Sequence, residues 1–228
     1  MSQYEIEIKS LLGSAERALK LREKVKEKGG TLVHKNNQLN HYFILNDVNK
    51  FKEKFNAHLT GEDLVKFNKI LEDLPAQAGG SNFSVRTRDT DGKVQLVIKA
   101  SIGSDTSANG VSRMEFESEI KMTLDDLDKL LLEAGLEYQA KWSREREEYK
   151  VGDTNICLDK NAGYGYMAEF EKIIPDASMA DSIKKDLLEI MDDFEVEELP
   201  QDRLERMFAF YNNNWRDYYG TDKIFNIE

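Results

Sequence analysis

The chain has 228 residues, of which 40% are hydrophobic and 33% are charged, and its formal net charge is −11. These values are typical of a globular protein, and the negative charge argues against non-specific nucleic-acid binding, which needs an excess of Lys and Arg. No apolar run approaches the roughly 18 residues of a membrane helix, and the first residues lack the basic and apolar regions of a secretory signal, so we expect neither a membrane span nor secretion.

The first elements in chain order are strands and capped helices. Alternating apolar and charged residues predict a strand over Tyr4–Lys9. Ser14 is typical of a helix N-cap, and a pair of glycines should end the helix that follows it. A second strand is predicted over Leu39–Leu45. Apolar residues at helical spacing then predict a helix that begins at Thr60 and ends before Pro75.

The rest of the chain continues this alternation of strands and helices. We predict strands over Phe83–Arg88, Val94–Ala100 and Ser112–Ile120, a helix over Thr123–Gly135, strands over Tyr138–Tyr149, Asn155–Asp159 and Tyr166–Ile173, and helices over about 178–194 and 200–211. Residues 103–110 should form a loop. Eight short strands with amphipathic helices are typical of an α+β fold, and we predict an eight-stranded antiparallel closed β-barrel with helices packed outside.

Ionised side chains share one face of strand after strand, because side chains two positions apart in a strand point the same way. In the first strand this face holds Glu5, Glu7 and Lys9, and apolar residues occupy the other. The pattern recurs in same-sign pairs, which repel each other on a solvated sheet. The further residues of this kind are Arg86, Arg88, Lys99, Arg113, Glu115, Glu117, Arg144, Arg146, Glu169 and Glu171. We interpret the charged faces as lining an enclosed, water-filled site; the alternative is that each face is simply solvated.

The residue types on this face indicate metal and phosphate chemistry. Clustered carboxylates without neighbouring His or Cys form an all-oxygen site, which suits Mg²⁺ or Mn²⁺ better than zinc. Arg and Lys side chains that converge suit an anion of high charge density, since the guanidinium fork matches phosphate oxygens. Two opposite charges about 5 Å apart interact by roughly 3 kcal/mol at an effective dielectric near 20, so several such contacts could hold a tetra-anion.

These residues resemble the signature of the CYTH domains, also called triphosphate tunnel metalloenzymes. The segment Tyr4–Lys9 matches the E-x-E-x-K motif of that family, which is a weak signal alone. The remaining elements follow in order over most of the chain, which makes a strong one: Arg86-x-Arg88, Lys99, Arg113-x-Glu115-x-Glu117, Arg144-x-Arg146-x-x-Tyr149, Asp159 and Glu169-Phe170-Glu171. The resemblance implies a tunnel-forming barrel and Mg²⁺- or Mn²⁺-dependent catalysis on a triphosphate.

The resemblance also implies roles for individual residues. The main metal ligands would be Glu5, Glu7, Glu169 and Glu171. Glu115 and Glu117 would bind a second metal or position water, and together with Glu5, Glu7 and Lys9 they are the candidate catalytic residues. The triphosphate clamp would comprise Lys9, Arg86, Arg88, Lys99, Arg113, Arg144 and Arg146. Asp159 would orient a basic neighbour or join the metal ligands.

Three features depart from the family pattern. We expect a single domain over 1–228, with a helical insertion at about 46–80 and a C-terminal helical extension at about 176–228. Lys141 is three positions before Arg144, so in a regular strand its side chain would point to the opposite face. Lys141 therefore has a structural role or follows a bulge. Trp215, Tyr218 and Tyr219 would pack in the tail or cover the tunnel mouth.

The motifs leave the reaction open. We favour a triphosphatase acting on tripolyphosphate, ATP or thiamine triphosphate. A class IV adenylate cyclase, which releases cyclic AMP and pyrophosphate, and a non-catalytic triphosphate-binding protein are the alternatives. The single cysteine, Cys157, excludes an internal disulfide and fits a reducing cytoplasm, which is the predicted location. We expect no nucleic-acid or membrane partner, and a monomer or homodimer.

Overall fold

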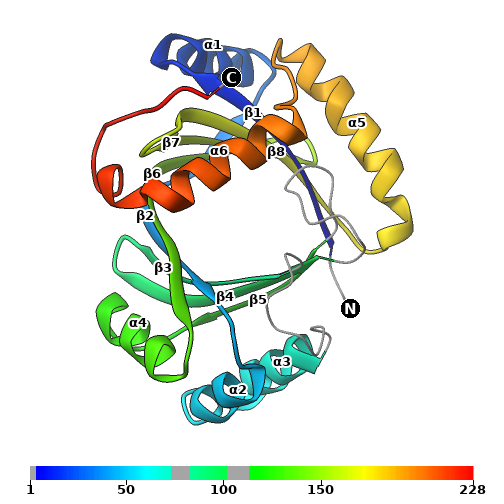
Figure 1. Ribbon diagram of the computed structural model, residues 1–228. Coiled ribbons are helices and arrows are strands. Elements are labelled where there is room, and N and C mark those ends of the chain that lie inside the picture. The colour runs from blue at the N-terminus through cyan, green and yellow to red at the C-terminus, as the bar shows by residue number, and fades with distance from the viewer. Residues whose placement is uncertain (1–3, 73–82, 102–112, 228) are drawn as a thin grey trace. The chain divides into compact units, whose positions relative to one another are not determined.

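The computed structural model describes residues 4–72, 83–101 and 113–227 (Figure 1). The side chains of residues 100–101, 113–115 and 177 fall outside this description, as does the predicted loop at 103–110. Among the described helices, none is long and apolar enough to cross a membrane.

Each of the predicted strands is present, and all but β5 are two to seven residues longer than expected. Their bounds are β1 Tyr4–Gly13, β2 Thr31–Ile44, β3 Phe83–Thr90, β4 Lys93–Ser101, β5 Arg113–Glu119, β6 Glu137–Val151, β7 Thr154–Asn161 and β8 Gly165–Ile174. The agreement follows from the period-two alternation of apolar and charged residues, which fits a pleated strand with one buried face.

The predicted helices are also present. Their bounds are α1 Ala15–Glu27, α2 Val48–Asn56, α3 Gly61–Glu72, α4 Leu124–Glu133, α5 Ala180–Asp193 and α6 Gln201–Asn214, with short 3-10 turns at Ala177–Met179 and Trp215–Asp217. The Ser14 hydroxyl accepts a hydrogen bond from the Arg17 amide, and the Thr123 hydroxyl accepts one from the Asp126 amide. Helix α2 was not predicted as a separate element; Asp47 caps it in the same way.

The chain divides into two compact units. The first unit comprises Met1–Gln38, Ser107–Ser112 and Trp142–Glu228, and the second comprises Leu39–Thr106 and Arg113–Lys141. In the first unit β6, β7, β8 and β1 pair in that order, all antiparallel. In the second unit β3, β4 and β5 pair in order, again antiparallel. The single domain expected from the sequence stays a prediction.

The predicted closed barrel is present. Hydrogen-bonded strands follow one another in the order β1-β5-β4-β3-β2-β6-β7-β8, and this order closes on itself. The α+β class and the antiparallel pairing are also as predicted. Strands with one charged and one apolar face suit a closed sheet whose apolar face is covered by helices.

In the first unit, the apolar face of the sheet packs against helices. Ile6 and Ile8 of β1 and Phe170 of β8 are fully buried, and they join a cluster that includes Leu187 and Met191 of α5. Helix α5 lies alongside β1 and β8 (Figure 1). Since adjacent residues of a strand point to opposite faces, the carboxylates that alternate with these apolar side chains lie on the other face.

In the second unit, the inserted helices supply an aromatic core. Phe51 and Phe55 of α2 and Phe67 of α3 are fully buried, and Phe67 packs on Phe116 of β5 with ring centroids 5.6 Å apart. The predicted insertion at 46–80 therefore contains two packed helices, and it contributes directly to the hydrophobic core.

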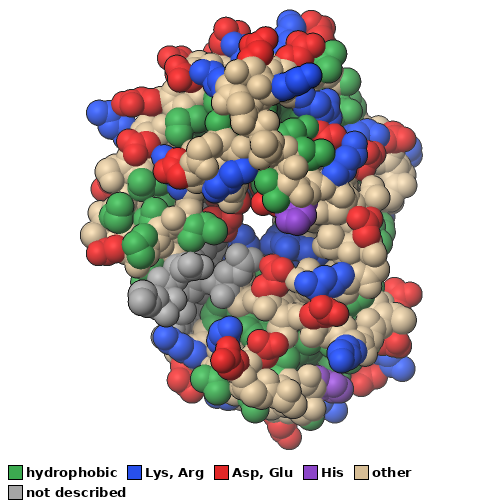
Figure 2. All heavy atoms as spheres, turned by 180° about the vertical axis from the view of Figure 1, so that it is seen from behind, with side chains coloured by type: hydrophobic (Ala, Val, Ile, Leu, Met, Phe, Trp, Pro, Cys, Tyr) green, Lys and Arg blue, Asp and Glu red, His purple; other side chains and the backbone are tan. Residues whose placement is uncertain are grey.

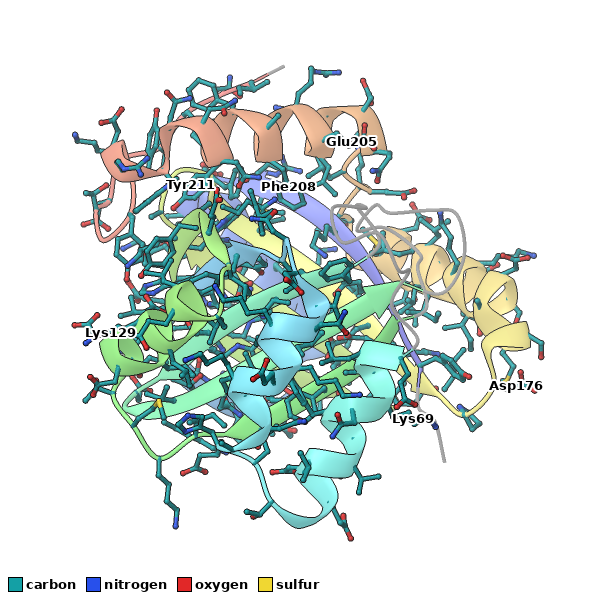
Figure 3. The ribbon with its side chains drawn as sticks, turned by 60° about the horizontal axis from the view of Figure 1, so that its bottom comes forward. Lys69, Lys129, Asp176, Glu205, Phe208 and Tyr211 are labelled. Atoms are coloured by element: carbon teal, nitrogen blue, oxygen red, sulfur yellow. The ribbon has the colours of Figure 1, made fainter. Side chains whose placement is uncertain are left out.

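The C-terminal extension packs on the first unit through aromatic side chains. Phe208 and Tyr211 of α6 (Figure 3) contact Trp142 of β6, with ring centroids 5.6 Å and 4.2 Å apart. Tyr218 packs on Phe225 at 5.3 Å, as the tail-packing interpretation of this region expects. On the outer surface, acidic and basic side chains are interspersed (Figure 2).

Candidate active site

The register of β1 against β8 brings the first and the last acidic motifs of the sequence together. Glu7 is directly opposite Glu171, and Lys9 is opposite Glu169. Directly opposed residues in an antiparallel pair have side chains on the same face. The apolar neighbours on both strands are buried against helices, so the two E-x-E motifs converge on the opposite side.

Glu5, Glu7 and Glu171 form a carboxylate cluster. One oxygen from each lies within 4.8 Å of the others. Oxygen ligands lie about 2.0–2.6 Å from a bound Mg²⁺ or Ca²⁺, so ligands on opposite sides of the ion are roughly 4–5 Å apart. The three carboxylates therefore fit one divalent cation. The pKa of Glu171 is raised to about 8, mainly by burial and next by the negative charge of the nearby Glu5 carboxylate. Asn155 donates a hydrogen bond to the Glu171 carboxylate at 3.1 Å.

Lys9 and Glu169 lie beside this cluster. Lys9 is 7% exposed; its Nζ donates to Glu7 at 2.7 Å and lies 3.7 Å from Glu169. Arg146 also donates to Glu169. Burial alone would raise the pKa of Glu169, but the positive charges of Arg146 and Lys9 outweigh it and hold that pKa well below its usual range. Glu169 is therefore held as an anion by its cationic neighbours.

Asp159 links the two arginines of β6. It is 1% exposed, and it accepts hydrogen bonds from Arg144 at 2.7 Å and from Arg146 at 2.7 Å and 2.6 Å. Arg144 also donates to Gln38 at 2.8 Å. These contacts are those expected of a residue that orients basic neighbours, and Asp159 does not belong to the three-carboxylate cluster found among the described residues.

The second unit holds the other basic candidates. Arg86 donates to the Tyr42 hydroxyl at 2.6 Å, and Arg88 donates to Asn40 at 3.1 Å and to Glu117 at 3.2 Å. Both arginines have the parity that the sequence predicted. Among the remaining candidates on this unit, Lys99 is half-buried on β4, and the side chains of Arg113 and Glu115 fall outside the described residues.

Sequence reasoning missed the neutral partners of these arginines. Gln38, Asn40 and Tyr42 occupy alternate positions of β2, and each accepts a hydrogen bond from an arginine. The available signal was a polar residue at every second position of a strand. Lys141, in contrast, lies 3.4 Å from the carboxylate of Asp128 on α4, which agrees with a structural role.

Comparison with protein families identifies the relationship. The model of the CYTH domain matches residues 76–203, which is more than half of the chain. The chain belongs to the CYTH family. CYTH proteins are generally metal-dependent and their substrates are triphosphates, so membership indicates an enzyme that acts on such compounds. The resemblance seen in the sequence is confirmed. The CYTH match does not reach β1, whose Glu5 and Glu7 approach the matched segment through the β1–β8 register.

Solved structures share the fold of this CYTH protein. The PH1819 protein from Pyrococcus horikoshii OT3 is 21% identical, with a TM-score of 0.60 covering 87% of this chain and 94% of that one. A conserved hypothetical protein from Pyrococcus furiosus is 16% identical, with a TM-score of 0.60 and coverage of 88% and 99%. A candidate adenylate cyclase from Vibrio parahaemolyticus is 17% identical, with a TM-score of 0.58 and coverage of 90% and 99%. At these identities the likeness concerns the fold alone. No curated protein matches the chain.

Proposed function

We propose that this CYTH protein is a metal-dependent hydrolase that cleaves the terminal phosphate from a triphosphate. The observation that carries the proposal is the convergence of Glu5, Glu7 and Glu171, whose oxygens lie within 4.8 Å of one another. A protein that only bound anions would gain nothing from clustered carboxylates, because they repel the ligand. Carboxylates, a divalent cation and basic side chains together are the usual components of phosphoryl-transfer sites.

The charge balance of the first unit supports a cation at this cluster. The carboxylates of Glu5, Glu7, Glu169, Glu171 and Asp159 are linked by the contacts described above with three cations, Lys9, Arg144 and Arg146. When all of them are ionised, two negative charges are in excess, and one Mg²⁺ or Mn²⁺ would neutralise them. A bound ion of this kind would supply electrophilic activation of the phosphate and of water.

The basic side chains have the complementary task of binding the substrate. We assign the phosphate oxygens to Lys9, Arg144 and Arg146 in the first unit and to Arg86, Arg88 and Lys99 in the second. Arg113 is assigned the same role from its motif. Asp159 holds two of these guanidinium groups in fixed directions, so the entropy of ordering them is lost on folding rather than on substrate binding.

The proposed reaction consumes one water molecule. A bond forms between the water oxygen and the terminal phosphorus, and the bond from that phosphorus to the bridging oxygen breaks. Tripolyphosphate then gives diphosphate and orthophosphate, with the proton released to solvent. Inorganic tripolyphosphate is the simplest substrate of this class; ATP and thiamine triphosphate carry the same anion with an organic group attached.

Product analysis tests the proposal. The purified chain is supplied with tripolyphosphate, ATP or thiamine triphosphate and with Mg²⁺ or Mn²⁺, and orthophosphate, pyrophosphate and cyclic AMP are measured. Orthophosphate without cyclic AMP supports the hydrolase. Cyclic AMP with pyrophosphate would instead assign the cyclase reaction, and binding without turnover under every metal condition would assign a binding protein.

Two variants connect the activity to the carboxylate cluster. Glu5→Gln and Glu7→Gln preserve size and remove a negative charge, so each should abolish turnover and leave the chain folded. Glu16→Gln is the matched control, because Glu16 lies on the exposed first turn of α1. An undiminished rate in the Glu5 or Glu7 variant would count against the role assigned to this cluster.

A further inference from the structure

Arg86 and Arg88 of β3 each donate a hydrogen bond to an oxygen that carries no charge. The Nη1 of Arg86 donates to the hydroxyl of Tyr42 at 2.6 Å, and the Nε of Arg88 donates to the Oδ1 of Asn40 at 3.1 Å. Both acceptors belong to β2 and lie two positions apart, so they share one face of that strand. A neutral acceptor fixes the direction of a guanidinium group without adding a negative charge beside it.

The first unit orients its arginines differently. Arg146 donates to the carboxylates of Asp159 and Glu169, so its charge is offset by two anions. On the second unit, Arg88 also donates to the carboxylate of Glu117, whose side chain is 36% exposed, so solvent screens this pair. The contacts made by Asn40 and Tyr42 are therefore suited to arginines whose positive charge serves a ligand.

A buried carboxylate fixes the same two strands from the opposite face. Asp128 of α4 is 2% exposed. It accepts a hydrogen bond from Thr87 at 2.7 Å and lies 2.6 Å from Nδ1 of His41. Thr87 is the residue between Arg86 and Arg88, and His41 is the residue between Asn40 and Tyr42. One carboxylate thus connects the backbone that carries the arginines to the backbone that carries their acceptors.

We propose that Asn40 and Tyr42 are positioning residues that direct Arg88 and Arg86 toward the phosphate oxygens of a polyphosphate without adding negative charge, and that Asp128 fixes both strands behind them. This inference rests on the proposed function, since it names the residues that prepare the phosphate-binding arginines of the same enzyme. It assigns a role to Asn40 and Tyr42, two of the polar residues at alternate positions of β2.

Asn40→Asp tests the importance of a neutral acceptor. Aspartate has nearly the size of asparagine and keeps an oxygen for Arg88, so the variant retains the hydrogen bond and changes the charge. One added negative charge close to the ligand should raise the KM for tripolyphosphate, and its dissociation constant measured by calorimetry in EDTA, about tenfold or more. The value of kcat should stay within about threefold of wild type. A purely structural residue would give an unchanged KM and an unchanged or higher Tm, because the new carboxylate pairs with Arg88.

Two further variants complete the experiment. Asn213→Asp makes the same chemical change at an exposed position of α6, and it should leave KM and the dissociation constant unchanged. Tyr42→Phe keeps the ring and removes the acceptor of Arg86, so it should raise both constants by roughly tenfold, as expected for a hydrogen bond to a charged group. If Asn40→Asp prevents folding, Tyr42→Phe decides the question.

The outcomes separate this inference from the proposed function. A wild-type chain that binds tripolyphosphate without hydrolysing it would refute the hydrolase, and the dissociation constants of the variants would still decide the inference. Wild-type affinity in Asn40→Asp would overturn it, and in the absence of that variant so would wild-type affinity in Tyr42→Phe. A wild-type chain that does not bind tripolyphosphate would overturn both.

Discussion

Asp159 offers a quantitative test of the electrostatics of the first unit. Its carboxylate is 1% exposed and accepts three hydrogen bonds, one from Arg144 at 2.7 Å and two from Arg146 at 2.7 Å and 2.6 Å. Asp159→Asn removes the negative charge and turns an amide NH₂ group toward a guanidinium donor. Removing one partner of a buried ion pair costs about 3–5 kcal/mol. Arg146 keeps its contact with Glu169, so we expect the lower end, about 3 kcal/mol of unfolding free energy.

Chemical and thermal unfolding measure this loss. Each kcal/mol shifts the Tm of a chain of this size by roughly 2–4 °C, so the variant should melt about 6–12 °C below wild type. Asp153→Asn is the matched control: Asp153 pairs with Lys172 at 3.1 Å but the Asp153 side chain is 78% exposed, and a pair whose carboxylate is in solvent contributes about 1 kcal/mol or less. If Asp159→Asn is no more costly than Asp153→Asn, the buried network does not hold the arginines as described.

The remaining predictions concern pH, packing and metal. Burial would raise the pKa of Glu147, but hydrogen bonds from Arg22, Lys35 and Tyr149 lower it to about 2. The stability that the ionised carboxylate contributes is therefore present above its ordinary pKa near 4.5 and is lost as pH falls from 4.5 toward 2. In pH-dependent melting, the Tm of Glu147→Gln should fall less over this pH range than the Tm of the wild type. Phe67→Ala should lower the unfolding free energy by about 3–5 kcal/mol in urea titrations, because Phe67 is fully buried, and a loss under 1 kcal/mol would contradict that packing. Mg²⁺ should raise the Tm of the wild type and not that of Glu7→Gln. An equal rise in both proteins would show that Mg²⁺ binds at a site that does not include Glu7.

Much of the secondary structure could be predicted because local chemistry determines it. Ser14 and Thr123 begin helices since their hydroxyls satisfy amides that would otherwise lack a partner. The strands follow from alternating burial. Helix α2 is short, and it was anticipated only as part of an inserted segment. Closure of the sheet was predicted from eight strands whose apolar faces the amphipathic helices need, which turns the ionised faces inward.

The candidate site was predictable in part. Glu7 and Glu171 are far apart in the sequence. The charged strand faces predicted that both line one site, and the resemblance to a family made both of them metal ligands. The β1–β8 register supplies the physical reason. Asn40 and Tyr42 were missed because uncharged side chains in a strand look the same whether they face solvent or an arginine. Asp128 was missed because an acidic residue in an amphipathic helix is ordinarily solvated.

The central claim is that the carboxylates of β1 and β8 hold a divalent cation, and a calorimetric titration with Mn²⁺ tests it most directly. We predict that one ion binds to each wild-type chain at this cluster, and that this binding disappears in a folded Glu5→Gln, Glu171→Gln double variant. Unchanged Mn²⁺ affinity and stoichiometry in the double variant would contradict the account.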